Sequence, residues 1–251
     1  MENIEVKIQQ YCKKYNIPIQ YLVEILEDQK VVPMIRGKAS EYNGTLFLQN
    51  HFKNSIDWIV TKFNLNPQPD MNDQDLTIIH RKTAIPIRVE VKNATRDSFT
   101  DGYRSRDCKI PHLTIKCHKS RSNIKKADST NDRYLLGDFD LIMSNTSNSI
   151  IVSGTKTLED FAITDNEAHL KVLYEYYRVN NKQDLIEKCY DDWRFAVPED
   201  IVMADGSIPH NPVVLLDSSK DPNWFTSHRL EDKLLEIVKR KQLQIRANRK
   251  R

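Results

Sequence analysis

Glycine is scarce in this chain: its 251 residues include only six glycines, and no two of them are close enough to form a phosphate-binding loop. The patterns GxGxxG, GxxxxGK(S/T) and GxSxG are therefore absent, and so is the zinc-protease pattern HExxH. These absences argue against protein kinases, P-loop NTPases, dinucleotide-binding dehydrogenases and α/β-hydrolases.

Cysteine and long apolar runs are equally limited. The four cysteines are dispersed without a CxxC pair, which is typical of free thiols in a reducing compartment. Cys108, His112, Cys117 and His118 are close in sequence, but their spacing matches no standard zinc finger or knuckle. No run approaches the roughly 18 apolar residues of a membrane span, and the first ten residues are polar where a signal peptide is apolar. The expectation is a soluble, cytoplasmic protein that does not associate with membranes.

The net charge of +3 conceals two basic segments. Residues 93–126 contain nine basic and three acidic residues, and residues 239–251 contain seven basic residues and no acidic one. Basic segments on an otherwise acidic chain indicate a polyanionic ligand, and nucleic acid is the commonest one. For the C-terminal segment, a solvated and frayed chain end is an equally good interpretation.

Hydrophobic periodicity predicts helices, then strands, then helices. Helical spacing covers 3–15, 18–28 and 40–63, strand-like runs cover 75–80, 85–92, 113–117, 134–143 and 149–152, and helical spacing returns at 166–179, 183–190 and 227–243. This order predicts an α/β (α+β) fold with a central mixed β-sheet flanked by helices. We expect one domain over 1–251, with a helical N-terminal part (1–66), a sheet core (67–155) and a helical C-terminal part with a basic tail (156–251).

The most informative pattern is an acidic pair beside a lysine. Residues 85–92 alternate, so that Glu90 and Lys92 lie on one face of a strand, opposite an aliphatic face. A hairpin centred on Lys82-Thr83 places Asp75 opposite Glu90 and gives consistent pairs on both faces. Two adjacent carboxylates suit a hard cation such as Mg²⁺, and Lys92 is placed to orient water or to contact a phosphate. The alternative is an ordinary Glu–Lys pair on a solvent-facing strand.

Asp75 followed by Glu90-Val91-Lys92 on a hydrophobic strand resembles the core of the PD-(D/E)xK nucleases, and the setting is similar to type II restriction endonucleases. Residues 134–143 and 193–214 also look like downstream parts of such enzymes. The resemblance implies a restriction-endonuclease-like core and Mg²⁺-dependent, sequence-specific cleavage of double-stranded DNA. It implies that Asp75, Glu90 and the Val91 carbonyl bind metal and that Lys92 is the catalytic lysine.

The same resemblance implies a homodimer in the bacterial cytoplasm that works beside a cognate DNA methyltransferase. One departure is that Gln74, not proline, precedes Asp75, and Asp70 in the preceding Pro-Asp pair is an alternative ligand. Glu41 is a further candidate, because such enzymes often supply an acid from a helix before the core and Glu41 lies on the predicted buried side of its helix. A solvent-facing glutamate near a helix start is the alternative for Glu41.

DNA contacts are expected from the basic residues that follow the catalytic strand, namely Arg96, Arg104, Arg106, Lys109, Lys116, Lys119 and Arg121. Three other interpretations stay open. They are a repair or junction-resolving nuclease of the same superfamily, a non-catalytic DNA-binding protein, and an interaction protein in which Glu90 and Lys92 merely pair.

Overall fold

The computed structural model describes residues 3–61, 75–95, 99, 111–119, 132–153, 161–163 and 166–248. Its helices are α1 (Ile4–Lys14), the 3₁₀ helix η1 (Ile19–Tyr21), α2 (Leu22–Leu26), α3 (Val32–His51), α6 (Ser147–Ile150), α7 (Glu167–Tyr177), α8 (Lys182–Asp191), α9 (Pro198–Ile201), the 3₁₀ helix η3 (Ser227–Arg229) and α10 (Leu230–Asn248). Its strands are β1 (Trp58–Thr61), β2 (Leu76–His80), β3 (Ile85–Asn93), β4 (His112–Thr114), β5 (Leu141–Asn145), β6 (Ile151–Ser153), β7 (Phe161–Ile163), β8 (Trp193–Ala196) and β9 (Val213–Leu215).

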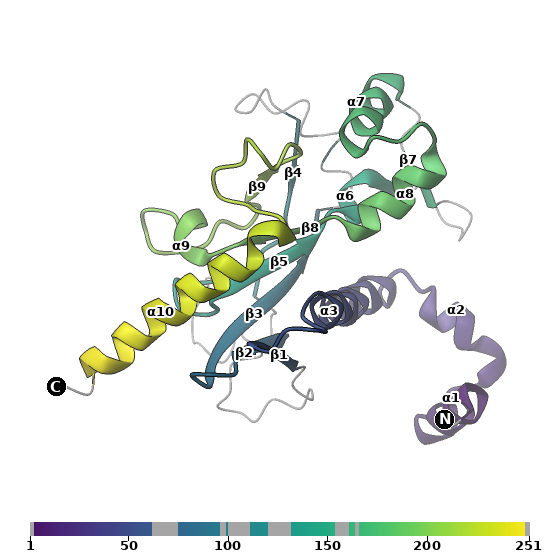
Figure 1. The fold of residues 1–251 in the computed structure, drawn as a ribbon. Helices are drawn as coiled ribbons and strands as arrows, with labels where there is room; N and C mark the ends of the chain where they lie inside the picture. The colour runs from purple at the N-terminus through teal and green to yellow at the C-terminus, as the bar shows by residue number, and fades with distance from the viewer. Residues whose placement is uncertain are drawn as a thin grey trace.

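Five strands form the central sheet in the order β1-β2-β3-β5-β8. The β3–β5 pair is parallel, and the other neighbours are antiparallel. Helices pack against this sheet, as Figure 1 shows for α3 and α10. The predicted fold class, a mixed sheet flanked by helices, is therefore confirmed.

The β2–β3 hairpin has the register that the sequence predicts. Leu76 pairs with Val89, and Thr77 pairs with Arg88. The loop comprises residues 81–84 and is centred on Lys82-Thr83, with Ala84 in the left-handed region at φ 54°. This register places Asp75 directly before the first paired residue of β2, at the level of Glu90.

Both faces of the sheet are covered. The aliphatic face of β3, including Ile87, Val89 and Val91, packs against α3 and α10 in one core. On the opposite face, Ile142 and Ala196 align with Glu90 and pack in a second core whose other members come from residues 94–139 and 201–224. The alternative of a Glu–Lys pair on a solvent-facing strand is therefore wrong in its exposure, because chain segments distant in sequence cover Glu90 and Lys92.

Three predicted segments differ from the observed ones, and in one of them, the predicted strand 149–152, Ser149 and Ile150 belong to α6 and β6 begins only at Ile151. Within the predicted helical stretch 40–63, α3 ends at His51, a turn closes where Ser55 N–H donates to the Phe52 carbonyl, and β1 follows. The predicted strand 134–143 begins only at Leu141, because Gly137 adopts φ 101° and the Asp138 carboxylate accepts a hydrogen bond from Leu135 N–H, which together form a turn. The central sheet also takes β8 from the predicted helical C-terminal part.

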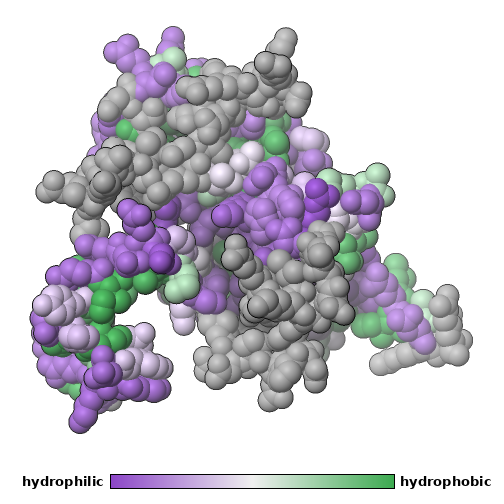
Figure 2. Space-filling model, turned by 180° about the vertical axis from the view of Figure 1, so that it is seen from behind, coloured by the Kyte–Doolittle hydropathy of each residue, from purple (hydrophilic) through white to green (hydrophobic). Residues whose placement is uncertain are grey.

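The two ends of the chain behave differently. Helices α1 and α2 form an arm that extends from the body and exposes many apolar side chains, including Ile4, Tyr11, Tyr15 and Val23 (Figures 1 and 2). The C-terminal segment is helical to Asn248, so a frayed end is excluded for residues 239–248. Lys241 of α10 donates to the Asp140 carboxylate and to the Pro86 carbonyl, which fastens this helix to β3.

Candidate active site

Asp75 is oriented by the strand that carries the other candidate residues. Its Oδ2 atom accepts a hydrogen bond of 2.7 Å from the Val91 backbone N–H. Because Val91 lies between Glu90 and Lys92 in β3, this bond fixes the Asp75 carboxylate beside the predicted ExK segment. The hairpin register thus brings together residues that are 15 or more positions apart.

Glu90 and Lys92 form a closed network with Tyr134. The Glu90 Oε1 atom lies 2.5 Å from the Lys92 ammonium and accepts a 2.6 Å hydrogen bond from the Tyr134 hydroxyl. Lys92 also donates to the Tyr134 oxygen at 2.9 Å and lies over its ring. Sequence reasoning missed the role of Tyr134, because nothing in a single tyrosine 44 residues from Glu90 indicates that it covers this carboxylate.

Glu41 reaches the same place from α3. It is buried, and its helix presents Leu48 to the sheet on the same side, as the sequence spacing predicts. Its carboxylate is paired with Lys38 one turn earlier, at 2.7 Å. Of the two interpretations of Glu41, the solvent-facing one is therefore excluded.

A pocket of about 230 Å³ joins these groups. Its lining residues come from α3, the start of β2, the end of β3 and the segment after β4, and they are Gly37, Glu41, Asp75, Val91, Lys92, Asn93, Lys116 and His118. The Glu90 carboxylate is not part of the lining, because it is bound to the Tyr134 hydroxyl and the Lys92 ammonium. The pocket is thus lined by both acidic and basic side chains.

The pKa of Asp75 reflects the carboxylates that lie close to it at the pocket. Asp75 keeps part of its surface in solvent, but burial of its carboxylate raises its pKa well above the ordinary value, and the charges of Glu90 and Glu41 raise it further. The Lys92 cation and the Val91 N–H act in the opposite direction without cancelling this effect. Ionised Asp75 is therefore costly to the free protein, and a bound cation would relieve that cost.

Burial by itself would lower the pKa of Lys92. The charge and hydrogen bond of Glu90, together with contributions from Tyr134 and Asp75, outweigh burial, and the pKa of Lys92 is raised well above its usual value. Lys92 is accordingly a fixed cation at neutral pH. It is suited to orienting water or binding a phosphate oxygen and not to accepting a proton.

The donor atoms fit a hard cation, with one restriction. Asp75 and Glu41 offer carboxylate oxygens at the pocket and Val91 lines it, which is the oxygen chemistry that Mg²⁺ prefers. Among the described residues, however, Asp75, Glu90 and Glu41 do not form a set of three oxygens within 4.8 Å of one another. The site suits a cation held by one or two carboxylates with waters, and Glu90 would have to leave Tyr134 to join.

Of the predicted DNA-contact residues, Lys116 and Lys119 are among the residues that the structure describes. Lys116 is exposed and lines the pocket, while Lys119 is paired with Asp138 at 2.8 Å. The remaining predicted contacts, and the alternative ligand Asp70, lie outside the described residues; they are Arg96, Arg104, Arg106, Lys109 and Arg121. Lys116 is thus the described member of the set that is placed to meet a ligand in the pocket.

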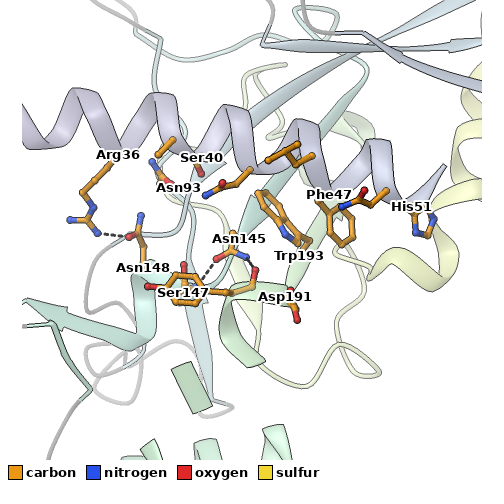
Figure 3. Close-up of a pocket in the computed structure, with 15 residues that line it drawn as sticks. Arg36, Ser40, Phe47, His51, Asn93, Asn145, Ser147, Asn148, Asp191 and Trp193 are labelled. Carbon is orange, nitrogen blue, oxygen red and sulfur yellow. Dashed lines mark hydrogen bonds between the residues drawn. The ribbon is translucent and has the colours of Figure 1, made fainter. Parts of the chain in front are cut away.

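A larger cleft of about 650 Å³ adjoins the pocket at Asn93, which lines both. One wall is α3 and the other is formed by the end of β5, α6 and the start of β8 (Figure 3). Arg36 reaches across it to the Asn148 side chain, and Asn145 is fixed by a hydrogen bond to the Tyr190 carbonyl.

Amide side chains dominate the polar lining of the cleft, with Asn43, Asn50, Asn93, Asn145 and Asn148. Amides both donate and accept hydrogen bonds, so this wall suits a ligand with mixed polar edges. Sequence reasoning missed the cleft because its asparagines come from α3, β3, β5 and α6, and the sequence does not report that α3 lies opposite the others.

No family model matches this chain, and neither the curated proteins nor the solved structures include a significant match. Within the described ranges, no helix has the length and apolar character required to cross a bilayer.

Proposed function

We propose that this chain is a Mg²⁺-dependent endonuclease that cleaves double-stranded DNA at a specific sequence, in the manner of type II restriction enzymes. The observation that carries the proposal is the hydrogen bond from Val91 N–H to Asp75, which sets an acidic group from the start of β2 into one pocket with Lys92. An Asp residue, an ExK strand and a helix glutamate meet there from separate parts of the chain.

In the proposed reaction the chain positions a phosphodiester against the pocket. Asp75, Glu90 and the Val91 carbonyl would hold Mg²⁺, which would acidify a water and neutralise charge on the scissile phosphate. Lys92 supplies a fixed positive charge for the attacking water or for a phosphate oxygen. Lys116, at the exposed edge of the pocket, contacts the DNA backbone.

Sequence recognition belongs to the same proposal. We assign it to the basic residues after β3, with Arg104 and Arg106 as base readers, and we expect a homodimer on a palindromic site with a protective methyltransferase as its functional counterpart. The amide-lined cleft adjoining the pocket supports contact with a ligand larger than one phosphate.

A second candidate is a DNA-binding protein without nuclease activity. It is favoured by the closed network in which Glu90 is already satisfied by Lys92 and Tyr134, as in a purely structural ion pair. The two candidates differ in whether DNA is cut when Mg²⁺ is present.

The deciding experiment incubates the protein with duplex DNA of high sequence complexity, in Mg²⁺, in Ca²⁺ and in EDTA, and reads the products on a gel. We expect discrete fragments in Mg²⁺, binding without cutting in Ca²⁺, and no cutting in EDTA. Asp75→Asn should abolish cutting. Lys82→Ala, which changes an exposed lysine at the far end of the same hairpin, should cut like the wild type.

Each outcome discriminates between the candidates. Salt-sensitive binding with no cutting under any metal would support the non-catalytic protein. Cleavage of branched substrates alone would support a junction-resolving or repair nuclease, and undiminished cutting in EDTA or by Asp75→Asn would overturn the proposed site.

A further inference from the structure

Outside the pocket described above, two histidines and an aspartate bring their ligating atoms together. Atoms of His118, Asp132 and His210 all lie within 4.8 Å of one another. His118 Nδ1 is 3.2 Å from Asp132 Oδ2, and His210 Nε2 is 2.5 Å from Asp132 Oδ1. The two imidazole rings are stacked, with centroids 4.4 Å apart and planes inclined at 23°.

The backbone holds these three residues in place from both sides. Cys117 N–H donates to the His210 carbonyl at 2.7 Å, and Lys119 N–H donates to the Asp132 carbonyl at 2.8 Å. His118 therefore sits between two residues that are each bonded to a segment carrying another member of the cluster. Such preorganisation reduces the entropic cost of collecting three ligands.

The charge of the cluster favours a cation. The Asp132 carboxylate lies within hydrogen-bond distance of both imidazoles and supplies an anionic oxygen beside their nitrogens. The three side chains are between 29% and 37% exposed, so an ion from solution has access.

We propose that His118, Asp132 and His210 bind one divalent transition-metal ion of the Zn²⁺ class. Two imidazole nitrogens and one carboxylate oxygen are a ligand set that such ions prefer over Mg²⁺, and three protein ligands leave a position for water. The site is separate from the carboxylates of Asp75 and Glu90, although His118 also lines their pocket.

This ligand set differs from the group of Cys108, His112, Cys117 and His118, which are close together in sequence. Cys117 is fully buried, and its sulfur is not among the ligating atoms that lie together with those of His118, Asp132 and His210. His112 is buried as well, and Cys108 lies outside the described residues.

The position of the site suggests its purpose. His118 and Asp132 flank residues 120–131, which include Arg121, Lys125 and Lys126. An ion bound by both residues would hold His118 and Asp132, which are 14 positions apart in sequence, against each other beside the pocket that His118 lines. Metal binding itself does not depend on the proposed nuclease activity.

The test uses the full chain, stripped of metal with a chelator and titrated with Co²⁺ and Zn²⁺. We expect one ion per chain, visible absorption from bound Co²⁺ that Zn²⁺ abolishes, and a higher melting temperature with Co²⁺. His118→Ala and His210→Ala should each weaken binding by about 100-fold. Asp132→Asn preserves the shape of a partly exposed side chain, and it should weaken binding by at least about 10-fold with the fold intact.

Three controls keep the result specific. His228→Ala, which removes an exposed histidine at η3, and Cys117→Ala should leave the affinity unchanged. Asp75→Asn should also leave it unchanged, so this site and the proposed Mg²⁺ site can fail independently. The proposal is overturned if binding is not saturable, if Asp132→Asn binds like the wild type, or if Cys117→Ala weakens binding while His210→Ala does not.

Discussion

At the residue scale, Asp75 is a group that the free protein would be more stable without. Its pKa is raised in the folded state by burial and then by Glu90 and Glu41, so the folded protein binds a proton more readily than the unfolded chain does. Stability therefore falls as pH rises from the unfolded pKa of about 3.9 through the folded pKa, and the loss is complete above the folded value.

Asp75→Asn should accordingly stabilise the metal-free protein while abolishing cleavage. We expect a gain at neutral pH on the order of 1 kcal/mol, which for a chain of this length raises the melting temperature by roughly 2–4 °C. Melting curves in EDTA between pH 4 and 8 measure it. Wild-type stability should decline across this window relative to the variant, and Glu175→Gln, on an exposed part of α7, should show no such divergence. A destabilised Asp75→Asn would contradict the electrostatic account.

Lys92 has a structural role that its sequence position conceals. Its side chain is 17% exposed and its partner Glu90 is 8% exposed, so removing the cation leaves a nearly buried carboxylate with Tyr134 alone. Lys92→Ala should destabilise the metal-free protein by about 3 kcal/mol. The paired variant Glu90→Gln/Lys92→Met, which carries no buried charge, should recover most of this loss in chemical denaturation. Equal destabilisation of both variants would show that packing, and not charge, sets the effect.

At the element scale, the hairpin could be predicted and the covering of its polar face could not. The alternation in β3 favours the register with β2 that pairs Leu76 with Val89 and Ile78 with Ile87 on the aliphatic face, so Asp75 and Glu90 are placed by local sequence. Strand β1 was missed because the apolar spacing of residues 56–63 also fits a helix. Tyr134, which closes the opposite face, is supplied by contacts distant in sequence, and strand periodicity does not report them.

Gly44 of α3 faces Met143 of β5 and Trp193 of β8 with little room for a side chain. A Cβ atom there would lie 3.3 Å from Met143 Cε and 3.4 Å from Trp193 Cη2, whereas at Gly37, two turns earlier, it would meet no atom within 4 Å. Gly44→Leu should therefore displace the helix that carries Glu41 and destabilise the fold by about 1–3 kcal/mol. Gly37→Ala should stabilise it by about 0.5–1 kcal/mol through helix propensity. Urea unfolding of both variants checks the contrast, which would be contradicted if Gly44→Leu were neutral.

At the scale of the whole molecule, the two basic segments have different structural roles. The segment 93–126 directly follows Lys92 in sequence, and its residue Lys116 lines the pocket. Arg104 and Arg106 lie outside the described residues, and their role stays a prediction. The C-terminal segment is largely helical, and part of its charge is used internally. Lys241 binds Asp140, and Arg240 pairs with Glu199 at 2.7 Å. Sequence composition alone could not separate internal cations from those available to a ligand.

The distinction between internal cations and cations available to a ligand leads to a prediction about the end of the chain. This prediction rests on the proposed DNA binding. Deleting residues 245–251 removes four basic residues, namely Arg246, Arg249, Lys250 and Arg251. The cut lies beyond the core, because Leu243 is 65% and Ile245 is 44% exposed, so the melting temperature should change little. Binding should weaken equally for all DNA sequences, and the slope of log K against log salt should flatten by roughly 0.9 for each phosphate that the tail no longer neutralises.

Lys241→Ala is the matched control for the deletion. It removes one cation from the same helix, but one that binds Asp140 and the Pro86 carbonyl, so it should lower stability and leave the salt dependence of binding unchanged. Titration of cognate and scrambled duplexes over a salt series, with melting curves of both variants, measures the contrast. If the deletion erased the preference for one sequence, recognition would lie in the tail, and the assignment of base reading to the residues after β3 would be wrong. If instead Lys241→Ala flattened the salt dependence and the deletion did not, Lys241 would contact DNA despite its hydrogen bond to the Asp140 carboxylate.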